Sequence, residues 1–178
     1  MQKHTVSSDV ELIEIKDKLI EKVSVTENLD HSILALETEI KELLKSLNSN
    51  ALQIHNNRKK VIPKLIAQLE DILKTLGMPN AKFEIKLNTS EKYFENGKDV
   101  LDFLFSANKG GSFNELKKAA SGGELSRIML AIKSVLAKYI QLPTIMFDEI
   151  DSGVSGEISN KMGDIMLQMS KTMQVFSI

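Results

Sequence analysis

The chain has 178 residues and a formal net charge of −1, with 42% hydrophobic and 26% charged residues. This apolar content suffices for a sizeable core, and the near-neutral charge gives no argument of its own for nucleic-acid binding. The absence of cysteine excludes disulfides and cysteine metal sites and fits a reducing compartment. No apolar run approaches the ~18 residues of a membrane span, and no signal core is present, so we expect a cytoplasmic protein without a membrane partner.

Glycine and proline divide the chain into two unlike parts. Residues 9–77 contain one proline and one glycine, whereas residues 78–178 contain eight of the nine glycines and two prolines. Because these residues punctuate regular structure, the first part is predicted to be helical and the second mixed α/β. We place a helical arm at residues 1–62 and a mixed α/β lobe at residues 63–178.

The predicted arm begins with a short helix from about Asp9 to Val23. A break is expected from Ser24 to Asn28, where Ser24 and Glu27 have the spacing of a capping box for the next helix.

The next helix, from about Leu29 to Val61, carries the clearest pattern in the sequence. Its apolar residues alternate by steps of four and three, with Asn50 at one step, and they are Leu29, Ile33, Leu36, Ile40, Leu43, Leu47 and Ile54. A lone helix cannot bury such a stripe, so this seam predicts a coiled coil with a partner helix. The alternative is an amphipathic helix on a globular core, but the stripe is narrow and has a 3.5-residue period.

Pro63 is expected either to kink this helix or to start a new one. A broader apolar face then extends from Leu65 to Leu76, as in a helix that docks onto a domain, and Gly77 is a natural stop.

The second part alternates predicted strands and helices. Strands are expected at Lys82–Asn88 and Val100–Ala107, joined as a hairpin by a turn at Glu95–Lys98, and short apolar strands at Pro143–Phe147 and Met173–Ile178. Helices are expected over Gly122–Tyr139 and Glu157–Lys171.

Two segments in this part carry chemistry. Small residues from Ala119 to Gly123 open a helix, so unpaired N–H groups and the helix dipole can form an anion site there. Taken alone, this pattern also describes an ordinary glycine-rich helix cap. The strand at Pro143–Phe147 delivers two carboxylates, Asp148 and Glu149, at its carboxyl end, which is the ligand edge of an α/β sheet. The first suits Mg²⁺ and the second can polarise a water molecule, although a solvated strand end is the common alternative.

The order and spacing of the two segments are more specific than either segment. A signature turn, a helix, a Walker B strand and a small-residue loop resemble the second half of an ABC-type ATPase. The wording goes further, because SGGELSRIMLAIK, TIMFDEIDSGVSGEIS and QVFSI resemble the bacterial RecN family of DNA-repair ATPases. This family is related to the structural-maintenance-of-chromosomes ATPases, and the resemblance extends over nearly the whole chain.

The resemblance implies an ABC-ATPase head divided by a long coiled coil, with two heads dimerising around ATP in double-strand-break repair. It implies that the signature residues bind the ATP of the opposing head: Ser121, Gly122, Gly123 and Glu124. Asp148 would bind Mg²⁺, and Glu149 would be the catalytic base. The D-loop at the dimer interface would comprise Asp151, Ser152, Gly153, Val154 and Ser155, although Ser155 stands where transporter relatives usually have Asp.

The chain departs from the family in lacking a GxxxxGK[ST] phosphate loop, a Q-loop and the switch histidine. We therefore expect a piece of a longer protein, inactive alone, whose partners are its missing amino-terminal half, a second head and DNA. Basic residues at Arg58–Lys60 and a net charge of 6 − 2 = +4 over residues 109–141 are DNA-contact candidates, although either could be a solvated face.

The alternatives are another chromosome-maintenance ATPase, an ABC transporter subunit and a purely structural coiled-coil protein. A transporter subunit usually has LSGGQ wording and lacks a heptad arm before its signature. A structural protein would leave Asp148 and Glu149 unexplained.

Overall fold

The computed structural model describes residues 9–178 except 120, 149, 151–153 and 155. The chain separates into two compact units, residues 1–52 and residues 53–178. The predicted boundary between the helical arm, residues 1–62, and the lobe, residues 63–178, stays a prediction.

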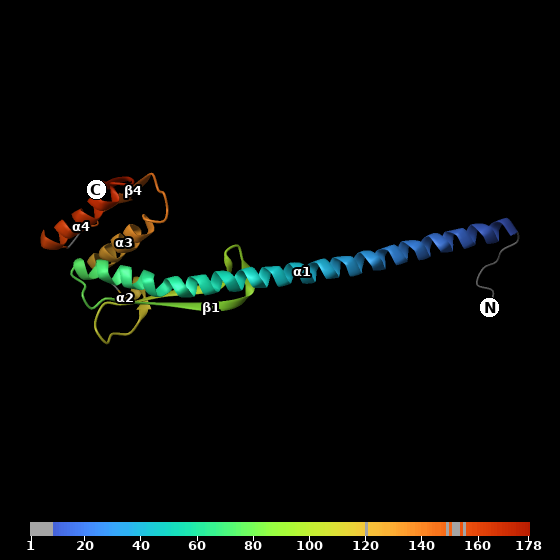
Figure 1. Cartoon of the computed structure of the whole chain (residues 1–178), viewed down its shortest axis with the longest axis horizontal. Helices are drawn as coiled ribbons and strands as arrows, with labels where there is room; N and C mark the ends of the chain where they lie inside the picture. The colour runs from blue at the N-terminus through green and yellow to red at the C-terminus, as the bar shows by residue number, and fades with distance from the viewer. Residues whose placement is uncertain (1–8, 120, 149, 151–153, 155) are drawn as a thin grey trace. The chain divides into compact units, whose positions relative to one another are not determined.

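A single helix, α1, extends from Asp9 to Thr75 (Figure 1). The expected break at Ser24–Asn28 is therefore wrong. The hydroxyl of Ser24 donates to the carbonyl of Glu21, and that of Thr26 donates to the carbonyl of Lys22. Because these short side chains bond back to the preceding turn, they are accommodated inside the helix and do not cap a new one.

Pro63 also lies inside α1 and does not start a new helix. A proline in a helix interior removes one backbone hydrogen bond and costs about 3 kcal/mol. Pro63 is exposed, whereas Leu69 and Leu73 on the following turns are buried in the core of the second unit. The packing of these later turns offsets the local cost.

In the first unit, the heptad seam is exposed. Its six apolar residues from Leu29 to Leu47 are 45% to 59% exposed. An exposed apolar stripe of this length is normally buried against another surface. The partner helix that the seam predicts stays a prediction.

The expected hairpin is confirmed and is longer than the sequence suggests. Strand β1 (Lys82–Phe94) pairs antiparallel with β2 (Gly97–Ser106), with Phe83 opposite Phe105. The short strand β3 (Asn114–Glu115) adds to β2, and the one-turn helix α2 (Leu116–Ala119) follows. Neither β3 nor α2 was expected, because two and four residues are too short to produce a period.

The remaining elements follow the predicted order. Helix α3 (Gly122–Leu136), strand β4 (Thr144–Phe147), helix α4 (Gly156–Met169) and strand β5 (Gln174–Ser177) succeed one another, and β4 pairs parallel with β5. A mixed α/β lobe preceded by a long helix is therefore confirmed. Helix α3 ends at Leu136, three residues before the predicted end.

The core of the second unit joins the last turns of α1 to the hairpin, α3 and α4. Its largest fully buried side chains are Leu69, Leu73, Leu76, Phe105, Ile128, Leu130, Val135 and Met162. The apolar face predicted before Gly77 therefore docks onto this unit. No helix in the described part of the chain is both long and apolar enough to cross a membrane.

Strand β4 is covered on one face only. Ile145 and Phe147 are buried, whereas Met146 is 58% exposed. The short apolar run predicted at Pro143–Phe147 does not by itself show whether one face or both faces of the strand are packed.

Candidate functional site

The signature turn opens α3, with Ser121 as its N-cap residue in an extended conformation. Ser121 and Gly122 are exposed, and a Cβ atom added to Gly122 would meet no atom within 4 Å. Helix N-termini bind anions because their first N–H groups lack partners within the helix. This turn can therefore be approached closely by a phosphate group.

Glu124 occupies one donor of this turn. Its Oε2 atom accepts a 2.9 Å hydrogen bond from the backbone N–H of Ser121. This is half of a capping box, in which a carboxylate also stabilises the positive end of the helix dipole. In this conformation, the N–H of Ser121 is not free for phosphate. The assignment of Glu124 to ATP binding stays a prediction.

Arg127 links α3 to the end of α1. Its Nε donates to the carbonyl of Gly123 at 3.2 Å, and its Nη1 donates to the carbonyl of Leu76 at 3.1 Å. The structure gives it two backbone acceptors, one of them 51 positions away.

Asp148 follows β4 directly and is exposed. The residues around it are anchored, because Phe147 and Ile150 are 3% and 4% exposed. The carbonyl of Phe147 also accepts a 3.0 Å hydrogen bond from the N–H of Ile178. The backbone at the strand end is therefore anchored, and the side chain of Asp148 is exposed to solvent.

The described residues contain no group of three or more His, Asp or Glu side chains that could hold a metal ion. A lone exposed Asp148 nevertheless fits Mg²⁺, because this ion often takes only one or two carboxylates and fills its other positions with water and phosphate oxygens. Glu149 and most of the predicted D-loop, residues 151–153 and 155, lie outside the described residues. Of the predicted D-loop, only Val154 is described, and it is half-buried.

A buried ionic cluster that the sequence did not reveal joins the hairpin to α1. Asp99 on β2 accepts hydrogen bonds from Nδ1 of His55 at 2.6 Å and from Nη1 of Arg58 at 2.8 Å. The second guanidinium nitrogen of Arg58 donates to the carbonyl of Asn96 at 2.8 Å. Because Arg58 is committed to the hairpin, only Lys59 and Lys60 of the predicted basic stretch are exposed.

The pKa of Asp99 reflects two opposing effects. Burial raises the pKa of this carboxyl group, whose side chain is only 3% exposed. The hydrogen bonds from His55 and Arg58, together with their charges, lower the pKa by more, so its net shift is downward from 3.8. Asp99 is therefore a carboxylate near neutral pH and can only accept hydrogen bonds from its two partners.

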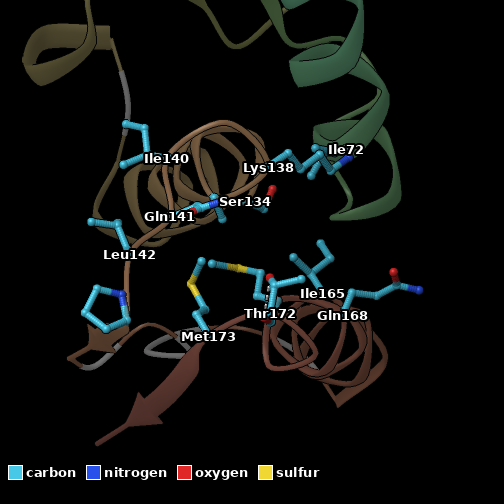
Figure 2. A pocket seen from close by; sticks show the side chains of 13 residues that line it. Ile72, Ser134, Lys138, Ile140, Gln141, Leu142, Ile165, Gln168, Thr172 and Met173 are labelled. Atoms are coloured by element: carbon cyan, nitrogen blue, oxygen red, sulfur yellow. Dashed lines mark hydrogen bonds between the residues drawn. The ribbon is translucent and has the colours of Figure 1, made fainter.

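A cavity of about 770 Å³ lies between the ends of three helices in the second unit. Figure 2 shows Ile72 of α1, Ser134 of α3 and Ile165 of α4 lining it. Its wall includes Pro143, which precedes β4, and the carboxyl-terminal part of α3. The cavity is thus at the opposite end of α3 from Ser121 and at the opposite end of β4 from Asp148, so it is not the predicted nucleotide site.

No protein-family model matches the chain. Among solved structures, the chain is similar to the Smc head domain with an extended coiled coil from Pyrococcus furiosus, with a TM-score of 0.60 and 22% identity over 96% of this chain and 41% of that chain. It is also similar to the Smc head domain with a coiled coil and joint from Pyrococcus yayanosii, with a TM-score of 0.60 and 20% identity over 99% and 36% of the two chains. These similarities show that the chain has the fold of part of an Smc head domain with its coiled coil.

Similarity to curated proteins is stronger. The chain is 33% identical to the DNA repair protein RecN of Halalkalibacterium halodurans and 37% identical to that of Rickettsia conorii, each over 91% of this chain. It is 32% identical to RecN of Haemophilus influenzae over 99% of this chain. The chain spans only 30% to 32% of the length of these relatives. Over nearly its whole length, the chain is therefore similar to about three tenths of a RecN protein.

Proposed function

We propose that the chain is part of a DNA double-strand-break repair ATPase of the RecN type, in which ATP is hydrolysed between two dimerised heads. The observation that carries the proposal is that the same chain presents an exposed signature turn at Ser121 and an exposed carboxylate at Asp148. This chain is similar to RecN over nearly its whole length. The similarity to Smc head domains supports the fold that the proposal needs.

The signature turn acts on the nucleotide of the opposing head in this proposal. The hydroxyl of Ser121 and the free N–H groups of Gly122 and Gly123 donate to phosphate oxygens, and the helix dipole of α3 favours their negative charge. Glu124 contributes by holding the turn in its capped conformation. The role of Glu124 is thus to shape the site, and direct contact with ATP is not required.

The strand end acts on the nucleotide of its own head. Asp148 would hold Mg²⁺, and the bound ion would neutralise negative charge on the phosphates of ATP. Glu149 accepts a proton from the attacking water. The D-loop, Asp151–Ser155, lies at the interface between the heads. The phosphate loop must come from another part of the protein, because this sequence contains none.

The proposed function also implies three partners. The missing amino-terminal half supplies the phosphate loop and a helix to cover the exposed seam of α1. A second copy supplies the second head. DNA is contacted in part by Lys59 and Lys60, which remain exposed on α1. Because the relatives are bacterial DNA repair proteins, we place the protein in the cytoplasm, at the nucleoid.

The experiment uses the full-length protein that contains this chain. Glu149→Gln keeps the size of the side chain but removes the base, so ATP turnover should fall by a factor on the order of 10² or more. ATP should still bind and should trap the closed head dimer, which sedimentation would detect. Asp164→Asn is the matched control, because Asp164 is an exposed acid on α4, and it should keep normal turnover.

Unchanged turnover in Glu149→Gln would remove Glu149 from the role of base. A wild-type protein that does not hydrolyse ATP would remove the proposed function as a whole.

The nearest competing function is that of another chromosome-maintenance ATPase, which the Smc-like fold favours. Such a protein would use the same residues in the same chemistry. The sequence of the amino-terminal half would separate the two functions.

A further inference from the structure

One of the two hydrogen bonds that Arg127 donates is to a signature residue, Gly123. Arg127 lies one turn after Gly123, and its Nε–H closes onto the Gly123 carbonyl at 3.2 Å. This carbonyl belongs to the peptide between Gly123 and Glu124, at the end of the signature residues Ser121–Gly123. The orientation of the guanidinium group and that of the signature turn are thus coupled directly.

The other hydrogen bond ends on a rigid feature of α1. The N–H of Met78 donates to the carbonyl of Leu73 at 2.9 Å, and the N–H of Gly77 donates to that of Lys74 at 3.4 Å. With Gly77 at φ = +77°, these two bonds form a Schellman motif at the end of the helix. The Leu76 carbonyl, which accepts from Arg127, lies within this motif. The negative end of the α1 helix dipole also stabilises a cation at this position.

Gly77 brings a third element to the same point. A Cβ atom at this residue would lie 2.6 Å from Cδ1 of Ile158 and 3.6 Å from Nη1 of Arg127. Ile158 is in the first turn of α4, which follows the predicted D-loop. The end of α1, the signature helix and the helix after the predicted D-loop therefore meet in close contact at Gly77.

We propose that Arg127 is a positioning residue that fixes the signature turn, Ser121–Gly123, to the end of α1. Through it, a shift of the α1 terminus moves the turn that completes the ATP site of the opposing head. The proposal rests on the ATPase function proposed above. Arg127 touches no reacting atom in this role and acts through the backbone of Gly123.

The arrangement requires arginine specifically. Arg127 bonds one carbonyl through Nε and another, on a different element, through Nη1. A lysine ammonium is a single compact group at the end of a flexible stem, and it lacks the rigid fork that joins two fixed acceptors. Arg127→Lys therefore keeps the charge and removes the link between the two carbonyls.

The experiment compares Arg127→Lys and Arg127→Gln with the wild-type full-length protein. In Arg127→Lys, kcat for ATP should fall about tenfold, as expected for one lost hydrogen bond to a charged group, and ATP-driven head dimerisation should weaken. The KM for ATP and ATP binding to the isolated head should change by less than about twofold, because the phosphate loop is untouched. Arg127→Gln should be at least as impaired.

Two controls separate positioning from stability. Lys161→Gln removes an exposed cation of α4 and should keep the wild-type kcat. Met169→Ala removes a buried side chain that is 5% exposed at the far end of α4, and it should lower the Tm at least as much as Arg127→Lys while keeping kcat.

Each outcome decides one question. A wild-type protein without ATPase activity would contradict the proposed function. An active wild type with an unimpaired Arg127→Lys variant would overturn only the role of Arg127. Losses of kcat that follow Tm equally in Arg127→Lys and Met169→Ala would also overturn that role.

Discussion

Replacing Asp99 with alanine should loosen the hairpin from α1. The change removes the acceptor of two hydrogen bonds, one from His55 and one from Arg58. A hydrogen bond to a charged group contributes about 1.5–3 kcal/mol. Because the His55 and Arg58 side chains are 23% and 30% exposed, water replaces part of what each loses. We expect a net loss of about 2–4 kcal/mol in the free energy of opening the hairpin.

Hydrogen exchange of the backbone amides in β1 and β2, followed by mass spectrometry, measures this loss. At tenfold for every 1.4 kcal/mol, the amides of the Asp99→Ala hairpin should exchange about 30 to 700 times faster than in the wild type. Asp102→Ala is the matched control on the same strand. Asp102 accepts an exposed hydrogen bond from Asn88, so its replacement should change the opening free energy by less than about 0.5 kcal/mol.

The effect should also depend on pH with a definite sign. The pKa of Asp99 is lowered from 3.8 in the folded chain. The stability that this carboxylate contributes is therefore fully present above its unfolded pKa and is lost as the pH falls through the lower folded value. The difference between wild type and Asp99→Ala should shrink in acid, as the pH falls through the lowered pKa of Asp99. Equal exchange in the Asp99 and Asp102 variants, or a difference that persists in strong acid, would refute the reasoning.

Three further predictions concern the glycine at the end of α1, the seam and the nucleotide. Gly77→Ala should destabilise the second unit by about 1–3 kcal/mol in thermal unfolding, because of its positive φ and the close approach of Ile158, whereas Gly163→Ala, with open space around it, should be neutral or stabilising. The 178-residue chain should self-associate in sedimentation runs at rising concentration. Leu36→Asp on the seam should prevent this self-association, and Thr38→Asp on the opposite face should not. A strictly monomeric wild type would contradict the coiled coil. Calorimetric titration of this chain alone with Mg-ATP should show no tight binding, since the sequence has no phosphate loop, and a low-micromolar dissociation constant would contradict the assignment.

The sequence predicted those helices and strands whose formation depends on residues that are close together in the chain. The alternation of Phe83, Ile85 and Leu87 with charged residues identified β1, and the helix end at Gly77 follows from the ease with which glycine adopts positive φ. Strand β4, which precedes Asp148, was predicted from its short apolar run and the two carboxylates that follow it; its parallel pairing with β5 was not predicted. In each case the residues that determine the structure are neighbours in sequence.

The errors arise where distant packing or a single hydrogen bond decides. A capping-box pattern at Ser24 suggested a helix start, but the hydroxyl bonds backwards to Glu21 and the helix continues. Pro63 is tolerated because the following turns are held by the core. The contact between Arg127 and Leu76 spans 51 positions, and the contact between His55 and Asp99 spans 44. No periodicity or spacing signals such contacts in one sequence.

The central claim is that Ser121 of one head and Glu149 of the other form a single ATP site, and a mixing experiment on the full-length protein tests it most directly. Ser121→Arg and Glu149→Gln should each be inactive alone. A hybrid dimer of the two has one site with both changes and one site with neither. With random pairing, half of the dimers are hybrids and half of their sites are intact, so about a quarter of the wild-type turnover should return. A mixture with verified hybrid dimers and no restored turnover would contradict the claim.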